Sequence, residues 1–155
     1  NISDTYDYIQ LLEPTNPLVF YDDIRRAMRK LHNYTAADFI VSVCKVEPHI
    51  PLGYAAPLPK DGTMTGWFPE NLRTQRTQDV SDGYHLDGNI YIGKDWVWKS
   101  GTDYWTTVVI PYEMPNNKYC HIDTEGDLVL AENLMKGLLN ERKSVRHSER
   151  RYVFD

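Results

Sequence analysis

Two common sources of chemistry are missing from this sequence: a cluster of cysteines and a glycine-rich phosphate loop. Only two of its 155 residues are cysteine, Cys44 and Cys120, and both lie in or beside apolar segments. Their wide spacing excludes a zinc ribbon or a dense disulfide scaffold and indicates buried thiols in a reducing compartment. None of the nine glycines completes a GxGxxG or GxxxxGK pattern. The residues present therefore provide no phosphate cradle of these kinds.

An excess of positive charge and a long apolar run are missing as well. Lys and Arg number 17 against 22 Asp and Glu, which gives a net charge of -5. A surface that binds nucleic acid needs the opposite balance, so no nucleic-acid partner is expected. No apolar run approaches the ~20 residues that span a bilayer, and no charged-then-apolar leader opens the sequence. We expect no membrane association, and a cytoplasmic protein.

The length and composition fit one globular domain over residues 1–155, with 41% hydrophobic and 25% charged residues. A strand, a helix and a second strand within about forty residues predict a βαβ unit, which is typical of a parallel sheet. We therefore expect an α/β fold with a mostly parallel, Rossmann-like sheet flanked by helices. The expected strands are Tyr8–Leu12, Phe39–Val46, Tyr84–Ile92 and Thr106–Ile110, and the expected helices begin near Asp22 and after Thr124.

A long stretch in the middle of the chain has a different character. Glu47–Ser81 holds five of the nine prolines and has few periodic apolar positions. A loop of this length inside a compact domain is more often functional or part of an interface than idle, although an irregular linker is the alternative.

The segment His121–Val129 combines a possible metal-ligand pair with the start of an amphipathic helix. Thr124 followed by Asp127 has the spacing of a capping box, so Asp123 lies just before the helix. In an extended chain, His121 and Asp123 point to the same side and can share one cation, with Mg²⁺ the usual partner of a carboxylate that works with phosphates. The alternative is that Asp123 only helps to cap the helix and His121 lines the end of a strand.

Three further segments carry polar groups suited to a ligand. In open parallel sheets, ligands bind outside the carboxyl ends of the strands, which predicts that Glu13–Leu18, Asp87–Tyr91 and His121–Asp123 lie near one crevice. Arg76, with Gln78 and Asp79 close by, offers a fork of donors, an amide and a carboxylate, a set suited to a polyhydroxylated acid. An ordinary polar surface is the alternative for this triplet.

Several of these segments, taken in order, resemble one family. Its motifs are matched from about Tyr8 to Leu139, and five motifs in the right order are far more specific than any one of them. The sequence is similar to the acylneuraminate cytidylyltransferases, which activate sialic, pseudaminic or legionaminic acid. The segments that carry this resemblance are Leu11–Leu18, Ile40–Val46, Arg76–Asp79, Asp87–Tyr91 and His121–Asp127, followed by Leu130–Glu132.

The resemblance implies a reaction and a set of site residues. Such enzymes join the CMP of CTP to the anomeric oxygen of a nine-carbon acidic sugar, a nonulosonic acid, and release pyrophosphate with Mg²⁺ as cofactor. By position, Asp123 matches the second metal-binding aspartate of the family and serves as the catalytic residue here. The implied contacts to CTP and sugar are Glu13, Thr15, Arg76, Gln78, Asp87 and Tyr91, with His121 beside Asp123 at the metal.

The resemblance also marks departures. His121 stands where the family has its first aspartate, Glu13 where a glutamine is typical, and Asp87 where asparagine is common. The family begins with a strand and a basic R-x-G-S-K-type loop that has no counterpart here, so the resemblance implies a longer protein and little activity for this chain alone. It also implies a homodimer formed through residues 47–87. The alternative is a divergent or truncated homologue that binds sugar or dimerises without catalysis.

Overall fold

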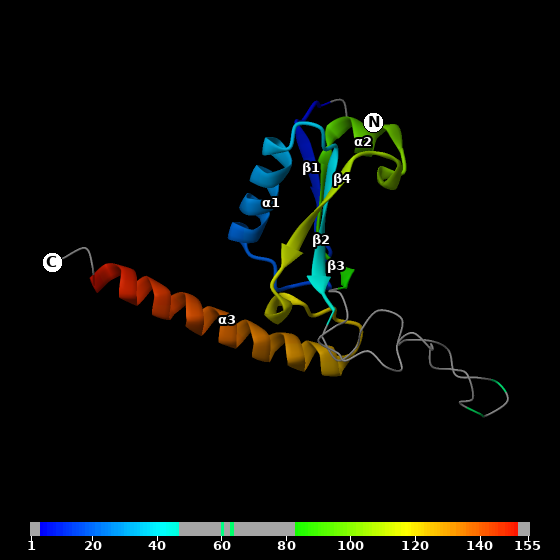
Figure 1. The fold of residues 1–155 in the computed structure, drawn as a ribbon. Coiled ribbons are helices and arrows are strands. Elements are labelled where there is room, and N and C mark those ends of the chain that lie inside the picture. Colours follow the sequence, from blue (N-terminus) through cyan, green and yellow to red (C-terminus); the bar gives the residue numbers. More distant parts are fainter. Residues whose placement is uncertain (1–3, 47–59, 61–62, 64–82, 152–155) are drawn as a thin grey trace, which may run out of the picture.

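The computed structural model describes residues 4–46, 60, 63 and 83–151, and in these ranges four strands and three α-helices form an α/β arrangement (Figure 1). Two single-turn 3₁₀ helices, η3 and η4, join them. In chain order the elements are β1 (Tyr8–Leu11), α1 (Tyr21–Asn33), β2 (Phe39–Lys45), β3 (Tyr84–Lys94), α2 (Asp95–Ser100), η3 (Tyr104–Thr106), β4 (Val109–Met114), η4 (Asn116–Lys118) and α3 (Glu125–Arg151).

The strands form one mixed sheet in the order β1-β3-β2-β4. β2 and β4 are parallel, with Ile40 opposite Ile110. β3 runs against both of its neighbours, pairing Gln10 with Ile92 and Phe39 with Gly93. β1, β2 and β4 therefore share one direction, and β3 runs the opposite way between β1 and β2.

The expectation of a mostly parallel sheet is thus only partly correct. The direction shared by β1 and β2 is what a βαβ unit requires, but β3 is inserted between them, so two of the three strand pairings are antiparallel. The sequence could not reveal this, because the pairing partner of a strand depends on contacts between residues far apart in the chain. β1 ends at Leu11, one residue before its predicted end, and it lies at the edge of the sheet with Leu11 exposed.

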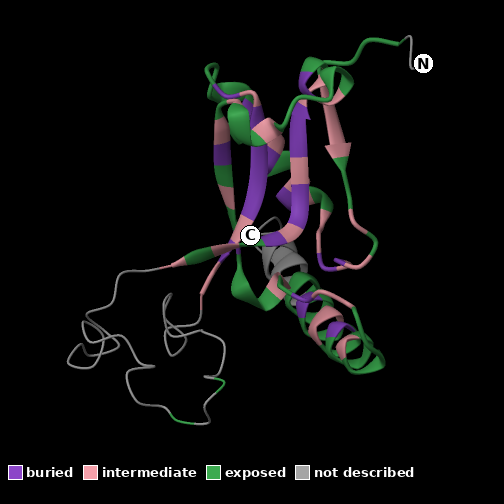
Figure 2. Ribbon diagram, turned by 90° about the vertical axis from the view of Figure 1, so that its right-hand side faces the viewer, coloured by how far each residue is buried: buried purple, intermediate pink, exposed green. Residues whose placement is uncertain are grey.

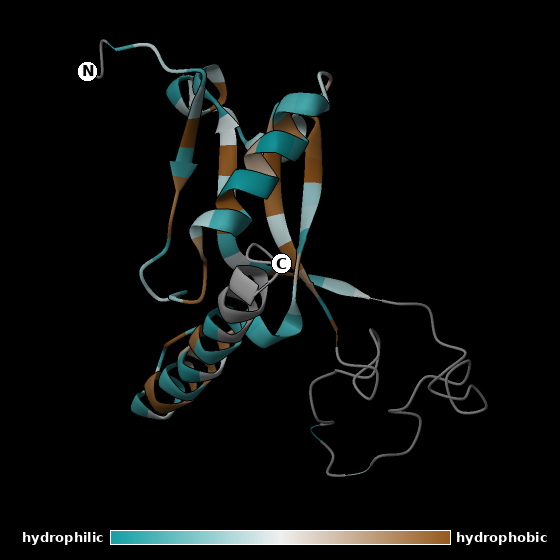
Figure 3. Ribbon diagram, turned by 90° about the vertical axis from the view of Figure 1, so that its left-hand side faces the viewer, coloured by the Kyte–Doolittle hydropathy of each residue, from teal (hydrophilic) through white to brown (hydrophobic). Residues whose placement is uncertain are grey.

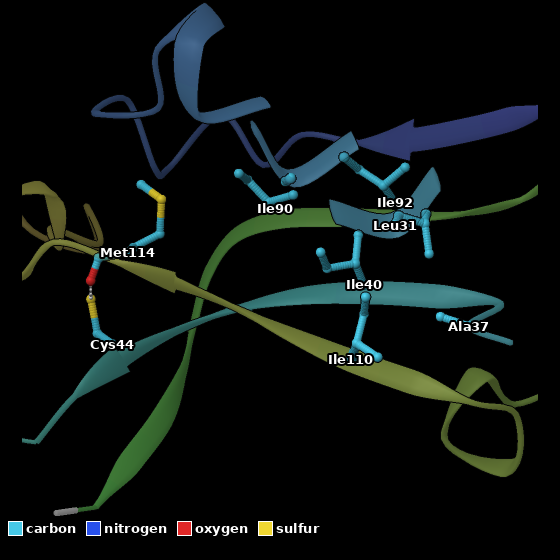
Figure 4. Packing of buried hydrophobic residues seen from close by; sticks show 9 residues of the cluster. Leu31, Ala37, Ile40, Cys44, Ile90, Ile92, Ile110 and Met114 are labelled. Atoms are coloured by element: carbon cyan, nitrogen blue, oxygen red, sulfur yellow. Dashed lines mark hydrogen bonds between the residues drawn. The ribbon is translucent and has the colours of Figure 1, made fainter. Parts of the chain in front are cut away.

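One face of the sheet is covered by α1, which begins after Phe20. The Phe20 backbone amide donates to Asp23 Oδ2 at 3.0 Å, which caps the start of the helix. Asp23 is also fully buried and is paired with Arg26 and Lys118. The helix presents Ala27 and Leu31 to the sheet, and most of its other residues are hydrophilic (Figure 3). Ala27 and Leu31 pack on alternate residues of the central strands, because successive strand residues point to opposite faces of the sheet. Figure 4 shows this core, formed by Leu31, Ala37, Ile40, Cys44, Ile90, Ile92, Ile110 and Met114.

The opposite face carries an aromatic cluster beneath α2 and η3. Phe39 is fully buried, stacks on Tyr104 with 4.4 Å between ring centroids, and meets Trp98 at 5.3 Å. Gly93 makes this packing possible, because a Cβ atom there would lie 2.4 Å from the Phe39 ring. The short helix α2 was not predicted from the sequence.

α3 begins after Thr124, as predicted, but does not lie on the sheet. Figure 1 shows it running away from the end of the sheet, and in Figure 2 most of its described part is exposed. Ala131 and Leu138 pack against Leu18 and Cys120 in a small separate cluster. Arg142 ties the helix to α1 through Asp22, with a separation of 2.8 Å. Of the two helices expected to flank the sheet, α1 therefore covers one of its faces and α3 does not.

Two strand boundaries also differ from the sequence-based prediction. β3 continues to Lys94, past the predicted end at Ile92, and Gly88, with a φ of 73°, lies at an irregularity in its pairing with β2. The strand expected at Thr106–Ile110 begins only at Val109 and continues to Met114, since residues 104–106 form a 3₁₀ turn. Among the described residues, none of the helices combines the length and apolar character needed to cross a membrane.

Candidate functional site

The three segments expected to share a crevice do come together. The Asn16 Nδ2 amide donates to the Gly88 carbonyl at 3.0 Å, and the Asn16 Oδ1 atom lies 3.3 Å from His121 Nδ1. The Ile122 amide donates to the Thr15 carbonyl at 2.9 Å, and the Thr15 hydroxyl lies 3.5 Å from His121 Nδ1. Residues 13–18, 87–91 and 121–123 thus form one site, which we call the convergence site.

The three segments come together for a different reason than predicted, because they do not all lie at the carboxyl ends of parallel strands. Residues 13–18 follow the carboxyl end of β1, but Asp87–Tyr91 lies within β3, which runs the other way. Because β3 is reversed, its first half lies at the same end of the sheet as the carboxyl ends of β1, β2 and β4. The antiparallel strand therefore brings Asp87 to the place where a parallel strand would bring its final residues.

His121 and Asp123 form a close pair at the outer side of the site. The His121 Nε2 atom lies 3.2 Å from Asp123 Oδ1, and the Asp123 side chain is 73% exposed. This confirms that the two side chains point the same way, as expected for residues two apart in extended chain. One carboxylate oxygen of Asp123 contacts the imidazole, and its side chain is open to solvent.

The cap of α3 is made by other residues than Asp123. Thr124 Oγ1 lies 2.8 Å from Asp127 Oδ2, the Thr124 amide donates to the same oxygen at 2.8 Å, and the Asp127 amide donates back to Thr124 Oγ1 at 3.3 Å. This is the predicted capping box. These bonds from Thr124, with one from the Asp123 amide, lower the pKa of Asp127. Asp123 contributes only its backbone N–H, so its carboxylate is left for another role.

Asp87 lies inside the protein. Only 3% of it is exposed, and its carboxylate accepts hydrogen bonds from the Ser42 hydroxyl, the Asn89 amide at 3.1 Å, the Asn89 side chain at 2.8 Å and the Cys44 thiol at 3.6 Å. Ser42 in turn accepts from the Ile90 amide at 2.7 Å. Buried polar groups need such partners, so this network fixes the bend at Gly88. Asp87 is thus a buried residue that holds the backbone of the site in place through Ser42 and Asn89.

Cys44 takes part in the same network and is unsuited to act as a nucleophile. Burial first, and then the charge of Asp87 and its hydrogen bond, raise the pKa of the Cys44 thiol to about 12. The thiolate is the reactive form of cysteine, so this thiol stays protonated and inert at neutral pH. The burial of Cys44 agrees with the buried thiol predicted from its apolar segment.

Glu13 and Asp87 both lie close enough to Tyr91 for their charges to act on its phenol. Burial raises the pKa of the Tyr91 phenol, and the charges of Tyr104, Glu13 and Asp87 raise it further. The phenol therefore remains a neutral hydrogen-bond donor throughout the physiological range. Arg76 and Gln78, the other two residues proposed to contact substrate, lie outside the described residues, as does nearly all of the segment 47–87.

The donor atoms fit a divalent cation, but fit Mg²⁺ only in part. The exposed carboxylate of Asp123 is the hard oxygen ligand that Mg²⁺ prefers, whereas the imidazole of His121 suits zinc and the later transition metals better. Within the described ranges, no group of three or more His, Cys, Asp or Glu side chains is placed to hold a metal. Further ligands for a cation at this pair would have to come from water or substrate.

Two residues of the site were missed by the sequence analysis as individual residues. Asn16, which is 4% exposed and joins Gly88 to His121, was hidden in the turn between Pro14 and Pro17. Ser42 carried a clearer signal, because it is the lone hydroxyl in the otherwise apolar run of β2. A polar residue in a buried strand needs a partner, which turned out to be Asp87.

Comparison with known proteins shows sequence similarity to one class of enzyme. No family model matches the chain. Its sequence is, however, similar to that of cytidylyltransferases, which confirms the resemblance found in the motifs. The pseudaminic acid cytidylyltransferases of Campylobacter jejuni serotypes O:2 and O:23/36 are 28% and 27% identical over 131 residues, or 84% of this chain and 55% of each relative. The chain spans about half the length of these curated relatives.

Proposed function

We propose that the protein containing this chain transfers CMP from CTP to a nonulosonic acid and releases pyrophosphate. The observation that carries the proposal is the similarity to pseudaminic acid cytidylyltransferases. Because the match covers 84% of the chain, the matched region extends over Asp87–Tyr91 and His121–Asp123 wherever it begins. These are two of the three segments that meet at the convergence site, where an exposed carboxylate and a neutral phenol are available.

The proposal assigns a role to each part of the site. Asp123 holds a divalent cation, proposed from the sequence to be Mg²⁺, which offsets charge on the phosphates of CTP. Thr15, Glu13 and Tyr91 contact the substrates with their hydroxyl, carboxylate and phenol groups. Asp87 keeps the Gly88 bend in place. The contacts of Arg76 and Gln78 with the sugar acid, a homodimer formed through residues 47–87, and a cytoplasmic location belong to the same proposal.

The reaction is tested on the gene product at its natural length. We would incubate it with CTP, a divalent cation and, in turn, pseudaminic, legionaminic and N-acetylneuraminic acid, and measure CMP-sugar by mass spectrometry alongside pyrophosphate release. Formation of at least one CMP-sugar, lost when UTP replaces CTP, is the expected result. Pyrophosphate at background with all three sugars would refute the proposal.

A second candidate is a homologue that binds sugar or dimerises without catalysis. The direct contact of His121 Nε2 with Asp123 favours it, because the two groups satisfy each other without a cation. The same experiment separates the two, since binding of a sugar in calorimetry without CMP-sugar formation supports the second candidate. Sedimentation across micromolar concentrations tests the homodimer independently of catalysis.

A further inference from the structure

Asp23, in the first turn of α1, is a fully buried carboxylate with three hydrogen-bond donors. It accepts from the Phe20 backbone amide at 3.0 Å, from Arg26 at 2.7 Å and from Lys118 at 2.6 Å. The Asp23 side chain is 0% exposed and the Lys118 side chain 12%. A buried charge is costly unless such donors surround it. The cap of α1 needs only the bond from Phe20, so capping alone does not account for the pair with Lys118.

Two segments of the chain run side by side from this ion pair to the convergence site. They are residues 15–20 and residues 118–122, which we call the paired segments. They meet at three levels, which are, from the ion pair to the site, Phe20 beside Lys118, Leu18 in one buried cluster with Cys120, and Thr15 bonded to Ile122. The residue numbers fall along one segment as they rise along the other, so the two segments run in opposite directions.

The far end of the paired segments carries side chains of the site. The Thr15 hydroxyl lies 3.5 Å from His121 Nδ1 there, and Asp123 follows directly after Ile122. The Ile122 amide donates to the Thr15 carbonyl at 2.9 Å, so this backbone bond fixes where the chain enters Asp123. The Asp123 side chain is 73% exposed, and packing therefore does little to hold it. Its position depends on the backbone of the paired segments.

A second ion pair ties α3 to the start of α1, but it is more exposed. Arg142 donates to Asp22 at 2.8 Å, and the two side chains are 44% and 40% exposed. Loss of one partner matters less in an exposed pair than in a buried one, because water replaces the missing partner. The pair of Asp23 and Lys118 is therefore the firmer of these two anchors.

We propose that Asp23 and Lys118 are positioning residues that place Asp123 in the convergence site through the paired segments. The inference rests on the proposed function for its effect on turnover, whereas the placement itself is measured without catalysis. Both residues lie outside the segments that make up the site and act only through them. A displacement of about 1 Å at a reacting group can lower a rate a hundredfold, so loss of the ion pair should lower kcat more than it raises KM.

The first measurement is turnover of the natural-length protein with CTP and the acidic sugar that it activates. In Lys118→Met, we expect kcat for CMP-sugar formation to fall about tenfold while KM for CTP stays within about threefold. Lys118→Arg keeps the charge and should retain kcat to within about threefold. Lys99→Met is the matched control, because it removes a part-buried ion pair with Asp95 at 2.8 Å on the other face of the sheet, and its kcat should stay within about twofold.

The second measurement is NMR of the natural-length protein with isotope-labelled isoleucine, which needs no turnover. The amide signal of Ile122 reports on its bond to Thr15. Asp23→Asn keeps the shape of the buried side chain and removes its charge, so we expect the Ile122 signal to move while the Ile92 signal, from β3, stays in place. In Lys99→Met, both signals should stay in place.

Each result bears on a different part of the inference. Unchanged kcat in a folded Lys118→Met variant, equal losses in Lys118→Met and Lys99→Met, or an Ile122 signal that does not move in Asp23→Asn would each overturn it. The NMR measurement on Asp23→Asn decides the question if Lys118→Met does not fold. A moving Ile122 signal in a protein that makes no CMP-sugar would refute the proposed function and support the placement by the ion pair.

Discussion

Two carboxylates lie at the same end of the sheet and are used in opposite ways. Asp87 is 3% exposed and accepts hydrogen bonds from Ser42, Cys44 and Asn89. The side chain of Asp123 is 73% exposed and contacts His121 through one oxygen. A carboxylate with its donors already in place has no free oxygen to offer a ligand. The comparison separates a residue that builds the site from one that is free to act in it, although both lie in segments that carry the resemblance to cytidylyltransferases.

The largest expected effect comes from removing the buried carboxylate. Asp87→Ala leaves two Asn89 donors without an acceptor and leaves the Ser42 hydroxyl only its long bond to the Ile90 carbonyl at 3.4 Å. We therefore expect the free energy of unfolding to fall by about 3 kcal/mol. Urea denaturation followed by circular dichroism measures this.

Asp87→Asn is the matched control for that change. The buried Asn89 Oδ1 has no partner at present, so the Asn89 amide can turn over and accept from the new side chain. We expect this variant to lose no more than about 1 kcal/mol. Equal losses in both variants would show that the network around Asp87 does not stabilise the fold.

Removing the exposed carboxylate should affect turnover and not stability. For Asp123→Asn in the natural-length protein, we expect kcat for CMP-sugar formation to fall about a hundredfold, or about 2.7 kcal/mol in the barrier, because a hard charged ligand is lost. Its unfolding free energy should stay within about 0.5 kcal/mol of the parent. Activity within a few-fold of the parent would remove Asp123 from the mechanism.

The Cys44 thiol reports on the charge of Asp87. Asp87 helps to raise the pKa of Cys44 to about 12, so Asp87→Asn should lower that pKa. A lower pKa increases the fraction of Cys44 present as thiolate, and alkylation of the thiol should speed up several-fold in proportion to that fraction. The rate is measured by mass spectrometry in a Cys120→Ser background. An unchanged rate would mean that burial alone controls the thiol.

The smallest effect concerns a third carboxylate, at the first turn of α3. The pKa of Asp127 is lowered in the folded chain by its bonds with Thr124, so its contribution to stability is present above its ordinary pKa of 3.8 and is lost as pH falls through the lowered value. Amide exchange in the first turn of α3 should therefore accelerate below about pH 3.8. Asp127→Asn should remove this dependence, and a pH response that persists in the variant would assign it to another group.

Local patterns predicted the local features well. The capping box of Thr124 and Asp127 lies where the spacing placed it, because both partners belong to the same turn of chain. The shared direction of His121 and Asp123 was predictable for the same reason. α2 and the true start of β4 were not predicted, since their short segments are stabilised by packing on Phe39 and not by a periodic pattern of their own.

The sequence by itself determined the residue types of the site, the helix that follows Asp123 and the resemblance to cytidylyltransferases. Only the tertiary structure decided that β3 runs against its neighbours, that α3 leaves the sheet, and that Asp87 is buried while Asp123 is exposed. Strand pairing and burial depend on which distant segments pack together. The residue type alone does not tell whether an aspartate will be buried or exposed. The contact between Asn16 and His121 joins residues that are 105 positions apart in the chain, and no local sequence pattern carries information over such a separation.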